Sequence, residues 1–338
     1  MDPEIVHFDA DAQEAERLGA LSPTGWRARS VAAPLGPETA GEAVDAAVIT
    51  TFIHSSVTAE TLDRLPLLKL MATRSTGYDH IDLAACAAHG VTVSNVPTYG
   101  ENTVAEHAFG LILALSRNIH RAWERTRRGD FSLEGLRGFD LQDRTLGVVG
   151  TGHIGLHVAR IARGFGMKVV ANDPNQNLFL ADLVGFEYAS LDRLLETSDI
   201  VSLHAPLLPS TRHMIDRERL DRMKPGALLI NTGRGGLVDT AALLDALQSG
   251  RLGGAGLDVF EGEDLIHEET RVSESPQAAA NRDLLRSQHE LLRRENVVLT
   301  PHMAFFSVEA EERIRETTIQ NIRSFLDGRP VNLVTRSA

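Results

Sequence analysis

Cysteine is nearly absent from this sequence. Only Cys86 is present among 338 residues, so no intrachain disulfide can form and no metal site can draw on several thiolates. The opening segment MDPEIVHFDADAQEAE also lacks the basic stretch followed by an apolar core that marks a secretory signal peptide. We therefore expect a cytoplasmic protein.

Long apolar runs and an excess of basic residues are missing as well. The best apolar candidate, His107–Ser116, is shorter than the roughly 20 residues of a membrane-spanning helix, so we interpret it as a buried helix. The net charge is −12, which argues against nucleic-acid or anionic-membrane partners, because both bind basic surfaces. The composition is that of an ordinary globular protein, and its length is sufficient for two domains.

The sequence does contain a regular alternation of short β-type runs and helical segments, which is typical of parallel α/β sheets. The expected strands of the N-terminal part are Ile5–Phe8, Ala46–Thr50, Leu68–Thr73 and Val91–Val96. A second series comprises Thr145–Gly150, Met167–Asp173, Asp199–Ala205, Ala227–Gly233, Gly254–Phe260 and Asn296–Pro301. Six strands with intervening helices match the size of a dinucleotide-binding sheet.

Helical patterns and one insertion fill the remaining sequence. Thr103 followed by Glu106 has the spacing of a capping box and predicts the start of an apolar helix between the two strand series. The stretch from Glu261 to Glu295 interrupts the α/β rhythm and is interpreted as an insertion before the last strand. Beyond Ser307, apolar residues at helical spacing predict a long C-terminal helix.

The segment GTGHIG, Gly150–Gly155, fits the pattern G-x-G-x-x-G. The pattern alone is weak, but here it follows an apolar strand and opens an amphipathic helix, the context in which it binds a pyrophosphate. We expect Gly150 to allow the tight turn, Gly152 to admit the pyrophosphate and Gly155 to permit close helix packing. Asp173 ends the next strand, where an acidic residue binds ribose hydroxyls and repels a 2′-phosphate, so the sequence favours NAD over NADP.

Three polar residues follow the ends of late strands, where open α/β sheets bind ligands. They are Arg234, Glu263 and His302. Each also has a structural interpretation: Arg234 as a surface guanidinium, Glu263 as part of a solvated acidic loop, and His302, in LTPHMAFFS, as a packed imidazole. Spacing alone leaves these alternatives open.

In its motifs and in their order, the sequence resembles the D-isomer-specific 2-hydroxyacid dehydrogenase family over essentially the whole chain. The resemblance is carried by RSTGYDHIDL, SDIVSLHAPLLPSTRHMI, INTGRGGLVDTAALLDALQSGRLGGAGLDVFEGE and ENVVLTPHMAF. Within the family, NVPTYGENTVAE, GEDL and PHMAFFS are most similar to the D-lactate dehydrogenase branch. The resemblance implies two doubly wound α/β domains, a Rossmann NAD domain (residues 99–303) inserted into a flavodoxin-like substrate domain (residues 1–98 and 304–338), and a homodimer.

The resemblance also implies roles for individual residues. Arg234 binds the substrate carboxylate and oxo group, His302 donates the proton, and Glu263 pairs with His302. The amides of Thr76 and Gly77 receive the substrate carboxylate. Tyr99, Phe52 and Phe305 are candidate walls of the substrate pocket, while Phe306 is expected to serve packing only. The implied NAD contacts are Thr103, Gly150, Gly152, His153, Ile154, Gly155, Asp173, His204, Ala205, Pro206, Thr232, Gly233 and Asp258.

Reduction of a 2-oxo acid needs a hydride at the carbonyl carbon and a proton at its oxygen, which a histidine beside a carboxylate can supply. The expected reaction is pyruvate with NADH to D-lactate with NAD. The alternatives are reduction of another 2-oxo acid, such as hydroxypyruvate, glyoxylate or a branched or aromatic acid, and an NAD-sensing corepressor built on the same fold.

Overall fold

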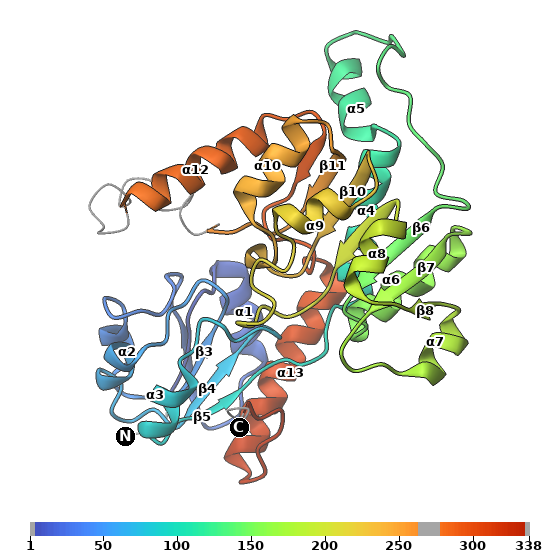
Figure 1. Cartoon of the computed structure of the whole chain (residues 1–338). Coiled ribbons are helices and arrows are strands. Elements are labelled where there is room, and N and C mark those ends of the chain that lie inside the picture. The colour runs from blue at the N-terminus through green and yellow to red at the C-terminus, as the bar shows by residue number, and fades with distance from the viewer. Residues whose placement is uncertain (1–3, 263–277, 335–338) are drawn as a thin grey trace. The chain divides into compact units, whose positions relative to one another are not determined.

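The computed structural model describes residues 4–262 and 278–334, and the chain divides into two compact units (Figure 1). Unit 1 comprises Met1–Tyr99 together with Ser307–Ala338, and unit 2 comprises Gly100–Phe306. The expected domain boundaries, after residues 98 and 303, lie close to these positions.

Unit 1 is built on a parallel five-stranded sheet in the order β2-β1-β3-β4-β5, which is the flavodoxin-like order. Its strands are β1 (Glu4–His7), β2 (Arg27–Ser30), β3 (Ala46–Thr51), β4 (Leu70–Thr73) and β5 (Thr92–Ser94). Its helices are α1 (Ala12–Leu21), α2 (Ala59–Asp63), α3 (Leu83–Ala88), α13 (Val308–Leu326) and the 3-10 turn η1 (Ala40–Ala43).

Both faces of this sheet are covered, because successive strand residues point to opposite sides. Ile5 and Leu70 share one apolar cluster with Ile319 and Ile322 of α13. Val6, Ile49 and Met71 belong to a second cluster that includes residues of α2 and α3. A helix from the C-terminal part of the chain thus completes the sheet of the N-terminal part.

Unit 2 contains a parallel seven-stranded sheet in the order β12-β11-β10-β9-β6-β7-β8. The strands are β6 (Thr145–Val149), β7 (Lys168–Asn172), β8 (Glu187–Tyr188), β9 (Ile200–Leu203), β10 (Ala227–Asn231), β11 (Leu252–Leu257) and β12 (Val297–Leu299). Its helices are α4 (Glu101–Ser116), α5 (Ile119–Arg127), α6 (His153–Gly164), α7 (Leu178–Val184), α8 (Leu191–Thr197), α9 (Arg217–Arg222), α10 (Thr240–Gln248), α12 (Ala278–Leu292) and the 3-10 turn η2 (Gly235–Leu237).

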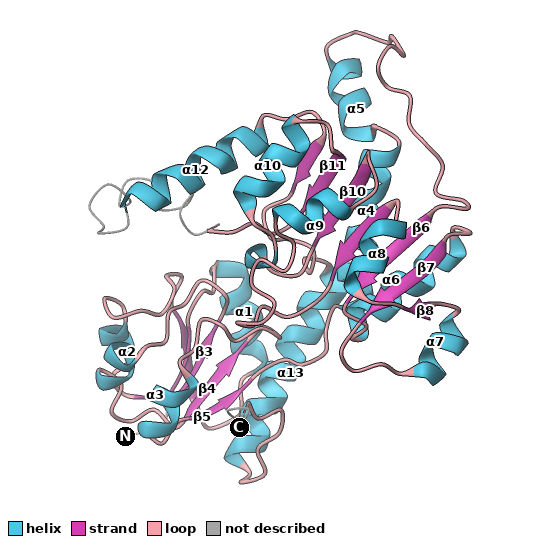
Figure 2. Cartoon of the chain, viewed as in Figure 1, coloured by secondary structure: helices cyan, strands magenta, loops and turns pink. Residues whose placement is uncertain are grey.

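Helices cover both faces of the unit 2 sheet (Figure 2). One face packs against α4 and α6, with Ile112 and Val158 in the same cluster as Val148 of β6. The other face packs against α8, α9 and α10, with Leu243 and Val201 in the second cluster. The strand order and the two helical layers are those of a Rossmann fold, so the expected fold class is confirmed.

Three features differ from the sequence-based expectation. Strands β2 and β8 were not predicted, since one is polar and the other has two residues. The capping-box prediction at Thr103 is wrong: α4 begins at Glu101 with Gly100 as its N-cap, so Thr103 lies within its first turn. The apolar residues of α4 are buried inside unit 2, as expected for His107–Ser116.

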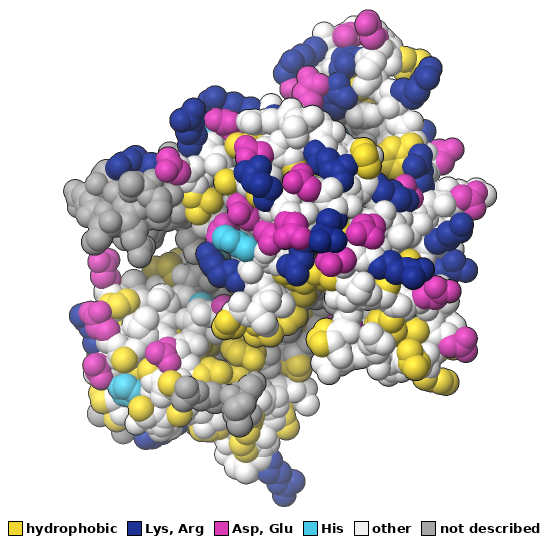
Figure 3. Space-filling view, viewed as in Figure 1, with side chains coloured by type: hydrophobic (Ala, Val, Ile, Leu, Met, Phe, Trp, Pro, Cys, Tyr) yellow, Lys and Arg dark blue, Asp and Glu magenta, His cyan; other side chains and the backbone are white. Residues whose placement is uncertain are grey.

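The surface carries charges of both signs. Figure 3 shows acidic and basic side chains interspersed over the face that it presents, with apolar side chains between them. Among the described helices, none combines the length and the apolar character that crossing a membrane requires.

Candidate functional site

The candidate site of unit 2 lies at the carboxyl ends of its parallel strands. Chain order reverses between β6 and β9, which are neighbours in the sheet, and ligands of open α/β sheets bind at such a switch point. The predicted residues that follow these strand ends are Gly150, Asp173, His204, Thr232, Gly233, Arg234, Asp258 and His302. The topology therefore brings them to one edge of the sheet.

The three motif glycines differ in what surrounds them. Gly150 has φ +93°, and an added Cβ would lie 2.8 Å from the carbonyl of His204. At Gly155 an added Cβ would lie 1.9 Å from the oxygen of Gly150, so α6 can pack against the turn only with glycine there. At Gly152, the N-cap of α6, a Cβ would meet nothing within 4 Å. The open space thus lies at the helix N-terminus, where a pyrophosphate binds.

The other two motif residues open the helix. His153 is the first residue of α6, and its exposed ring lies 3.6 Å from the carboxylate of Glu101. Ile154 is partly buried and packs against the apolar cluster beneath the sheet. Both side chains therefore stand beside the glycine turn.

Asp173 is tied directly to the glycine turn. Its carboxylate accepts hydrogen bonds from the backbone N–H groups of Thr151 and Asn175, each at 2.7 Å. The Thr151 hydroxyl contacts the hydroxyl of Tyr188 at 2.9 Å. A half-buried carboxylate held at the end of β7 is suited to accept hydrogen bonds from a ribose.

Two buried polar atoms at this edge have no hydrogen-bond partner within the described chain. They are Nδ1 of His204, at the end of β9, and Oγ1 of Thr232, at the end of β10. Burial lowers the pKa of His204 to about 4, so its ring is neutral at pH 7. The other ring nitrogen, Nε2, contacts the Ser202 hydroxyl at 2.8 Å. Buried polar atoms are normally satisfied, and these two fit a polar ligand such as a dinucleotide.

The remaining predicted cofactor contacts flank these atoms. Ala205 and Pro206 directly follow His204, and the amide nitrogen of Ala205 would lie 2.9 Å from a Cβ at Gly150. Thr103 lies in the first turn of α4. The glycine turn, Asp173 and the two unpartnered atoms together make this edge compatible with a bound NAD.

The loop that carries Arg234 is ordered by a buried asparagine. Asn231 is 1% exposed; its side chain donates to the oxygen of Arg234 at 2.9 Å and accepts from the N–H of Gly233 at 3.0 Å. Gly235 is required next, because an added Cβ would lie 2.1 Å from the carbonyl carbon of Phe260. Arg234 thus projects from a turn fixed on both sides.

Asp258 organises the turn that carries His302. Its carboxylate accepts hydrogen bonds from the Thr300 hydroxyl at 2.6 Å and from the N–H groups of Met303 at 2.9 Å and Ala304 at 2.8 Å. Its backbone oxygen accepts the N–H of His302 at 2.9 Å. Asp258 is 1% exposed, so the predicted nicotinamide contact would be additional to this role in holding the His302 turn.

Glu263, the predicted partner of His302, lies outside the described residues, and its pairing stays a prediction. Phe305 is partly buried, and its ring lies 6.0 Å from that of Phe306. Phe306 is 59% exposed, so its ring packs against Phe305 at the surface of unit 2. The role of Phe305 as a pocket wall stays a prediction.

In unit 1 the predicted substrate residues follow neighbouring strands. Phe52 comes directly after β3, and Thr76 and Gly77 follow β4, so the three lie at one edge of the sheet. The N–H groups of Thr76 and Gly77 donate to no backbone carbonyl of the described chain. Tyr99 ends this part of unit 1. Its backbone oxygen accepts a hydrogen bond from the Arg313 side chain of α13 at 2.5 Å.

A loop network holds Phe52. Its N–H donates to the Asp9 carboxylate at 3.1 Å, and the Ser55 hydroxyl donates to the same oxygen at 2.6 Å. The Arg74 guanidinium lies 5.9 Å from the centre of the Phe52 ring and donates to the backbone oxygen of Asp9 at 2.7 Å. Sequence reasoning missed the roles of Asp9, Arg74 and Asn231, although Arg74 and Asn231 lie within RSTGYDHIDL and INTGRGG. The contacts of Asp9 and Arg74 join residues that are distant in the chain, so no local pattern reveals them.

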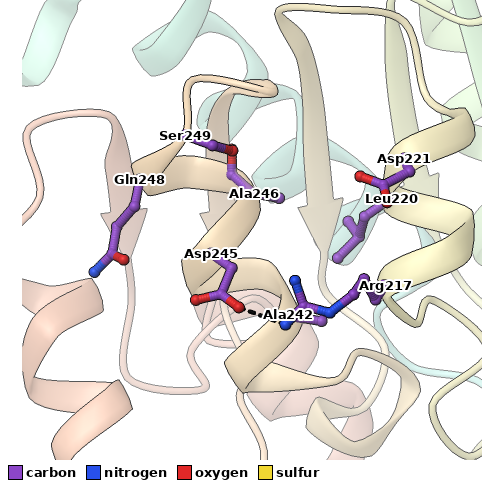
Figure 4. Close-up of a pocket in the computed structure, with 8 residues that line it drawn as sticks. All are labelled: Arg217, Leu220, Asp221, Ala242, Asp245, Ala246, Gln248 and Ser249. Carbon is purple, nitrogen blue, oxygen red and sulfur yellow. Dashed lines mark hydrogen bonds and ion pairs between the residues drawn. The ribbon is translucent and has the colours of Figure 1, made fainter.

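A pocket of about 450 Å³ lies elsewhere in unit 2, between α9 and α10 (Figure 4). It is lined by Arg217, Leu220, Asp221, Ala242, Asp245, Ala246, Gln248 and Ser249. Arg217 forms an ion pair with Asp245 across it. None of the predicted site residues lines this pocket. The described residues also contain no cluster of three or more histidine, cysteine or acidic side chains suited to a metal ion.

The sequence and fold match those of known proteins. Residues 109–304 match the family described as D-isomer specific 2-hydroxyacid dehydrogenase, NAD binding domain. The chain is 43% identical to a 2-hydroxyacid dehydrogenase homolog of Zymomonas mobilis, over 85% of this chain and 86% of the relative. The identified pyruvate reductase of Chlamydomonas reinhardtii has a TM-score of 0.87 and 41% identity, covering 97% of this chain and 98% of that one.

A second solved structure contains ligands. D-Lactate dehydrogenase from Aquifex aeolicus, complexed with NAD and lactic acid, matches with a TM-score of 0.88 and 35% identity, covering 99% of this chain and 100% of that one. The family match spans more than half of the chain and includes the glycine turn, the Arg234 loop and the His302 turn. This protein belongs to the D-isomer-specific 2-hydroxyacid dehydrogenases, NAD-dependent oxidoreductases of 2-hydroxy acids.

Proposed function

We propose that this enzyme reduces pyruvate to D-lactate with NADH, and that it also catalyses the reverse reaction. The observation that carries the proposal is the pair of fixed turns at the same edge of the unit 2 sheet, with Arg234 after β10 and His302 after β12. A guanidinium and an imidazole are the two side chains that reduction of a 2-oxo acid requires. The similar pyruvate reductase and D-lactate dehydrogenase support the choice of substrate.

Arg234 binds the substrate carboxylate, because a guanidinium presents paired donors that match the two carboxylate oxygens. The same cation stabilises the negative charge that develops on the oxo group as the carbonyl is reduced. Asn231 orders the backbone of the turn before the substrate arrives, and the Arg234 guanidinium donates to the backbone oxygen of Gly233 at 2.9 Å. A turn that is ordered in advance lowers the cost of binding.

His302 donates a proton to the oxygen of the reduced carbonyl and takes it back in the oxidation. Glu263 is proposed as the carboxylate partner of His302. The nicotinamide supplies or receives the hydride when NAD is bound. Asp173 binds the adenosine ribose and disfavours a 2′-phosphate, while His204 and Thr232 supply polar atoms to the dinucleotide.

The amides of Thr76 and Gly77 contribute further donors to the substrate carboxylate. In this proposal Phe52 and Tyr99, and separately Phe305, each serve as an apolar contact for the substrate side chain. Aromatic contacts favour an apolar side chain such as the methyl group of pyruvate over a charged one.

The test is steady-state oxidation of NADH and NADPH with glyoxylate, pyruvate, hydroxypyruvate, 2-oxobutyrate, 2-oxoisocaproate and phenylpyruvate. We expect the highest kcat/KM with pyruvate and NADH, and the D isomer of lactate as the product. A higher kcat/KM with a longer acid would identify that acid, and not pyruvate, as the preferred substrate. Turnover with none of these acids would contradict the dehydrogenase function and leave a sensor role.

We also propose a homodimer. Exposed apolar side chains gather on α5 and the segment after it: Ile119 is 53%, Trp123 61%, Phe131 77% and Leu133 83% exposed. This part of unit 2 stands apart from its sheet (Figure 1). A second copy of the chain would remove these side chains from water. The resemblance places the dimer contact on the apolar helix from Val104, which is α4. Because most apolar residues of α4 are buried inside unit 2, we propose α5 for the contact.

The oligomeric state tests this surface. Light scattering of the purified protein should give twice the chain mass, and Trp123→Glu should shift it towards the monomer, because a charge would be buried in the interface. Phe179→Glu is a matched control, since Phe179 is 75% exposed on α7. A monomeric wild-type protein, or a dimeric Trp123→Glu variant, would contradict this surface.

A further inference from the structure

The backbone at His302 adopts a conformation that histidine seldom takes. Its φ is +50°, in the left-handed region that costs a non-glycine residue about 1–3 kcal/mol. The N–H of His302 donates to the backbone oxygens of both Asp258 and Thr300 at 2.9 Å. The turn therefore keeps its shape only while surrounding groups hold it there.

Asp258 is the group that holds the turn, as its three accepted hydrogen bonds show. One of these bonds depends on the Thr300 hydroxyl, which has a single proton and gives it to Asp258 at 2.6 Å. The Thr300 oxygen can then only accept from another donor. That donor is His107 of α4, whose Nε2 lies 3.0 Å from the Thr300 oxygen and 3.5 Å from the Asp258 carboxylate.

The direction of these bonds assigns the proton of the His107 ring. Since Thr300 accepts, His107 must carry hydrogen on Nε2. A chain of hydrogen bonds thus runs from the His107 Nε2–H to the Thr300 hydroxyl, from there to the Asp258 carboxylate, and from Asp258 to the amides of the His302 turn. Each bond polarises the next, which strengthens the chain in a buried setting.

We propose that His107 is a positioning residue for the proton donor, acting on His302 through Thr300 and Asp258. The inference rests on the proposed role of His302. The contacts of His107 that carry this role are with the Thr300 hydroxyl and the Asp258 carboxylate. It fixes the orientation of the Thr300 hydroxyl, so that the buried Asp258 charge is satisfied and the turn does not relax out of its left-handed conformation.

Two pairs of variants separate hydrogen bonding from packing. His107→Leu removes the donor, whereas His107→Gln retains an N–H donor at a similar reach. Thr300→Val removes the hydroxyl at nearly constant volume, whereas Thr300→Ser retains it. A displacement of the proton donor by about 1 Å can lower the rate by up to ~100-fold. We therefore expect kcat to be ~10- to 100-fold lower in His107→Leu and Thr300→Val. In His107→Gln and Thr300→Ser we expect kcat close to that of the wild type.

Three readouts distinguish positioning from general destabilisation. In His107→Leu the NADH Kd, measured by fluorescence, should stay near the wild-type value, and the solvent deuterium isotope effect on kcat should rise because proton transfer becomes slower. His120→Leu is the matched control: His120 lies on α5 and contacts the backbone oxygens of Ala114 and Glu295. It should lower Tm without changing the isotope effect.

The outcomes separate this inference from the proposed function. Wild-type turnover in His302→Ala would overturn the proposed function and this inference with it. Loss of turnover in His302→Ala together with wild-type kcat and isotope effect in His107→Leu would overturn the inference alone. If Thr300→Val does not fold, the comparison of His107→Leu with His107→Gln decides, and equal loss in both would also overturn it.

Discussion

Replacement of Asp173 by asparagine should change the cofactor preference with little change in shape. The Asp173 carboxylate lies at the end of β7 and is held by the N–H groups of Thr151 and Asn175. The 2′-phosphate of NADP would approach this charge at the ribose. The substituted amide would keep one of these two backbone hydrogen bonds through its oxygen and lose the other, while removing the negative charge.

The size of the effect follows from Coulomb repulsion. Two unit charges about 4 Å apart repel by ~4 kcal/mol at an effective dielectric constant of about 20. Because Asp173 is only half-buried, solvent screening reduces this to roughly 1.4–2.8 kcal/mol. We therefore expect the ratio of kcat/KM with NADPH to that with NADH to rise by ~10- to 100-fold in Asp173→Asn.

Initial-rate measurements over a range of NADH and NADPH concentrations, at saturating 2-oxo acid, provide the assay. Asp182→Asn, an exposed substitution on α7, removes the same charge from a neighbouring helix and should leave the ratio unchanged. An unaltered ratio in Asp173→Asn, with a Tm close to that of the wild type, would refute the argument that this carboxylate excludes the phosphate.

Further predictions concern the glycine turn, the reacting residues and a buried histidine. Gly155→Ala should lower Tm by an amount equivalent to about 2 kcal/mol or more, since its Cβ would overlap a backbone oxygen, whereas Gly152→Ala should keep Tm and raise the NADH Kd. Arg234→Ala should lower kcat and raise KM together. Glu263→Gln should move the pH profile of 2-oxo acid reduction to lower pH. An unmoved profile would disprove the pairing of Glu263 with His302. Burial and the charge of Arg74 lower the pKa of His7 from 6.5 to about 3. Between these two pH values His7 is protonated in the unfolded chain but not in the folded chain. The free energy of unfolding therefore falls by up to ~1.4 kcal/mol for each pH unit between about 6.5 and 3. His7→Gln should reduce that slope in denaturant titrations at pH 7 and pH 5, and identical slopes would contradict the assignment.

The sequence predicted those parts of the fold in which local pattern and global packing agree. Strands such as β6 and β10 are continuous apolar runs because both of their faces are buried. Strand β2, with the sequence RARS, lies at the sheet edge and is only partly buried, so its composition carries no strand signal. Strand β8 has two residues and is likewise an edge strand, too short for any periodicity.

The same limit applies to the site. The glycine turn could be predicted because its chemistry is contained in six consecutive residues. The His107 contact could not, because its partner Thr300 lies 193 residues further along the chain. Within LTPHMAFFS the sequence drew attention to His302, but the left-handed turn and the Asp258 carboxylate that holds it appear only once β11 and β12 lie side by side.

The return of α13 to unit 1 has a consequence for the order of folding. Ile319 and Ile322 pack into the same cluster as Ile5, Val48 and Leu70, and Ser94 forms a bridge with Leu333. During synthesis, the segment from Glu4 to Tyr99 leaves the ribosome with one face of its sheet covered by α1 but not yet by α13. Unit 2 is continuous in sequence and can fold before α13 has been synthesised. Unit 1 is therefore the last to close, and ribosome-bound chains that end before α13 should recruit chaperones through this exposed sheet.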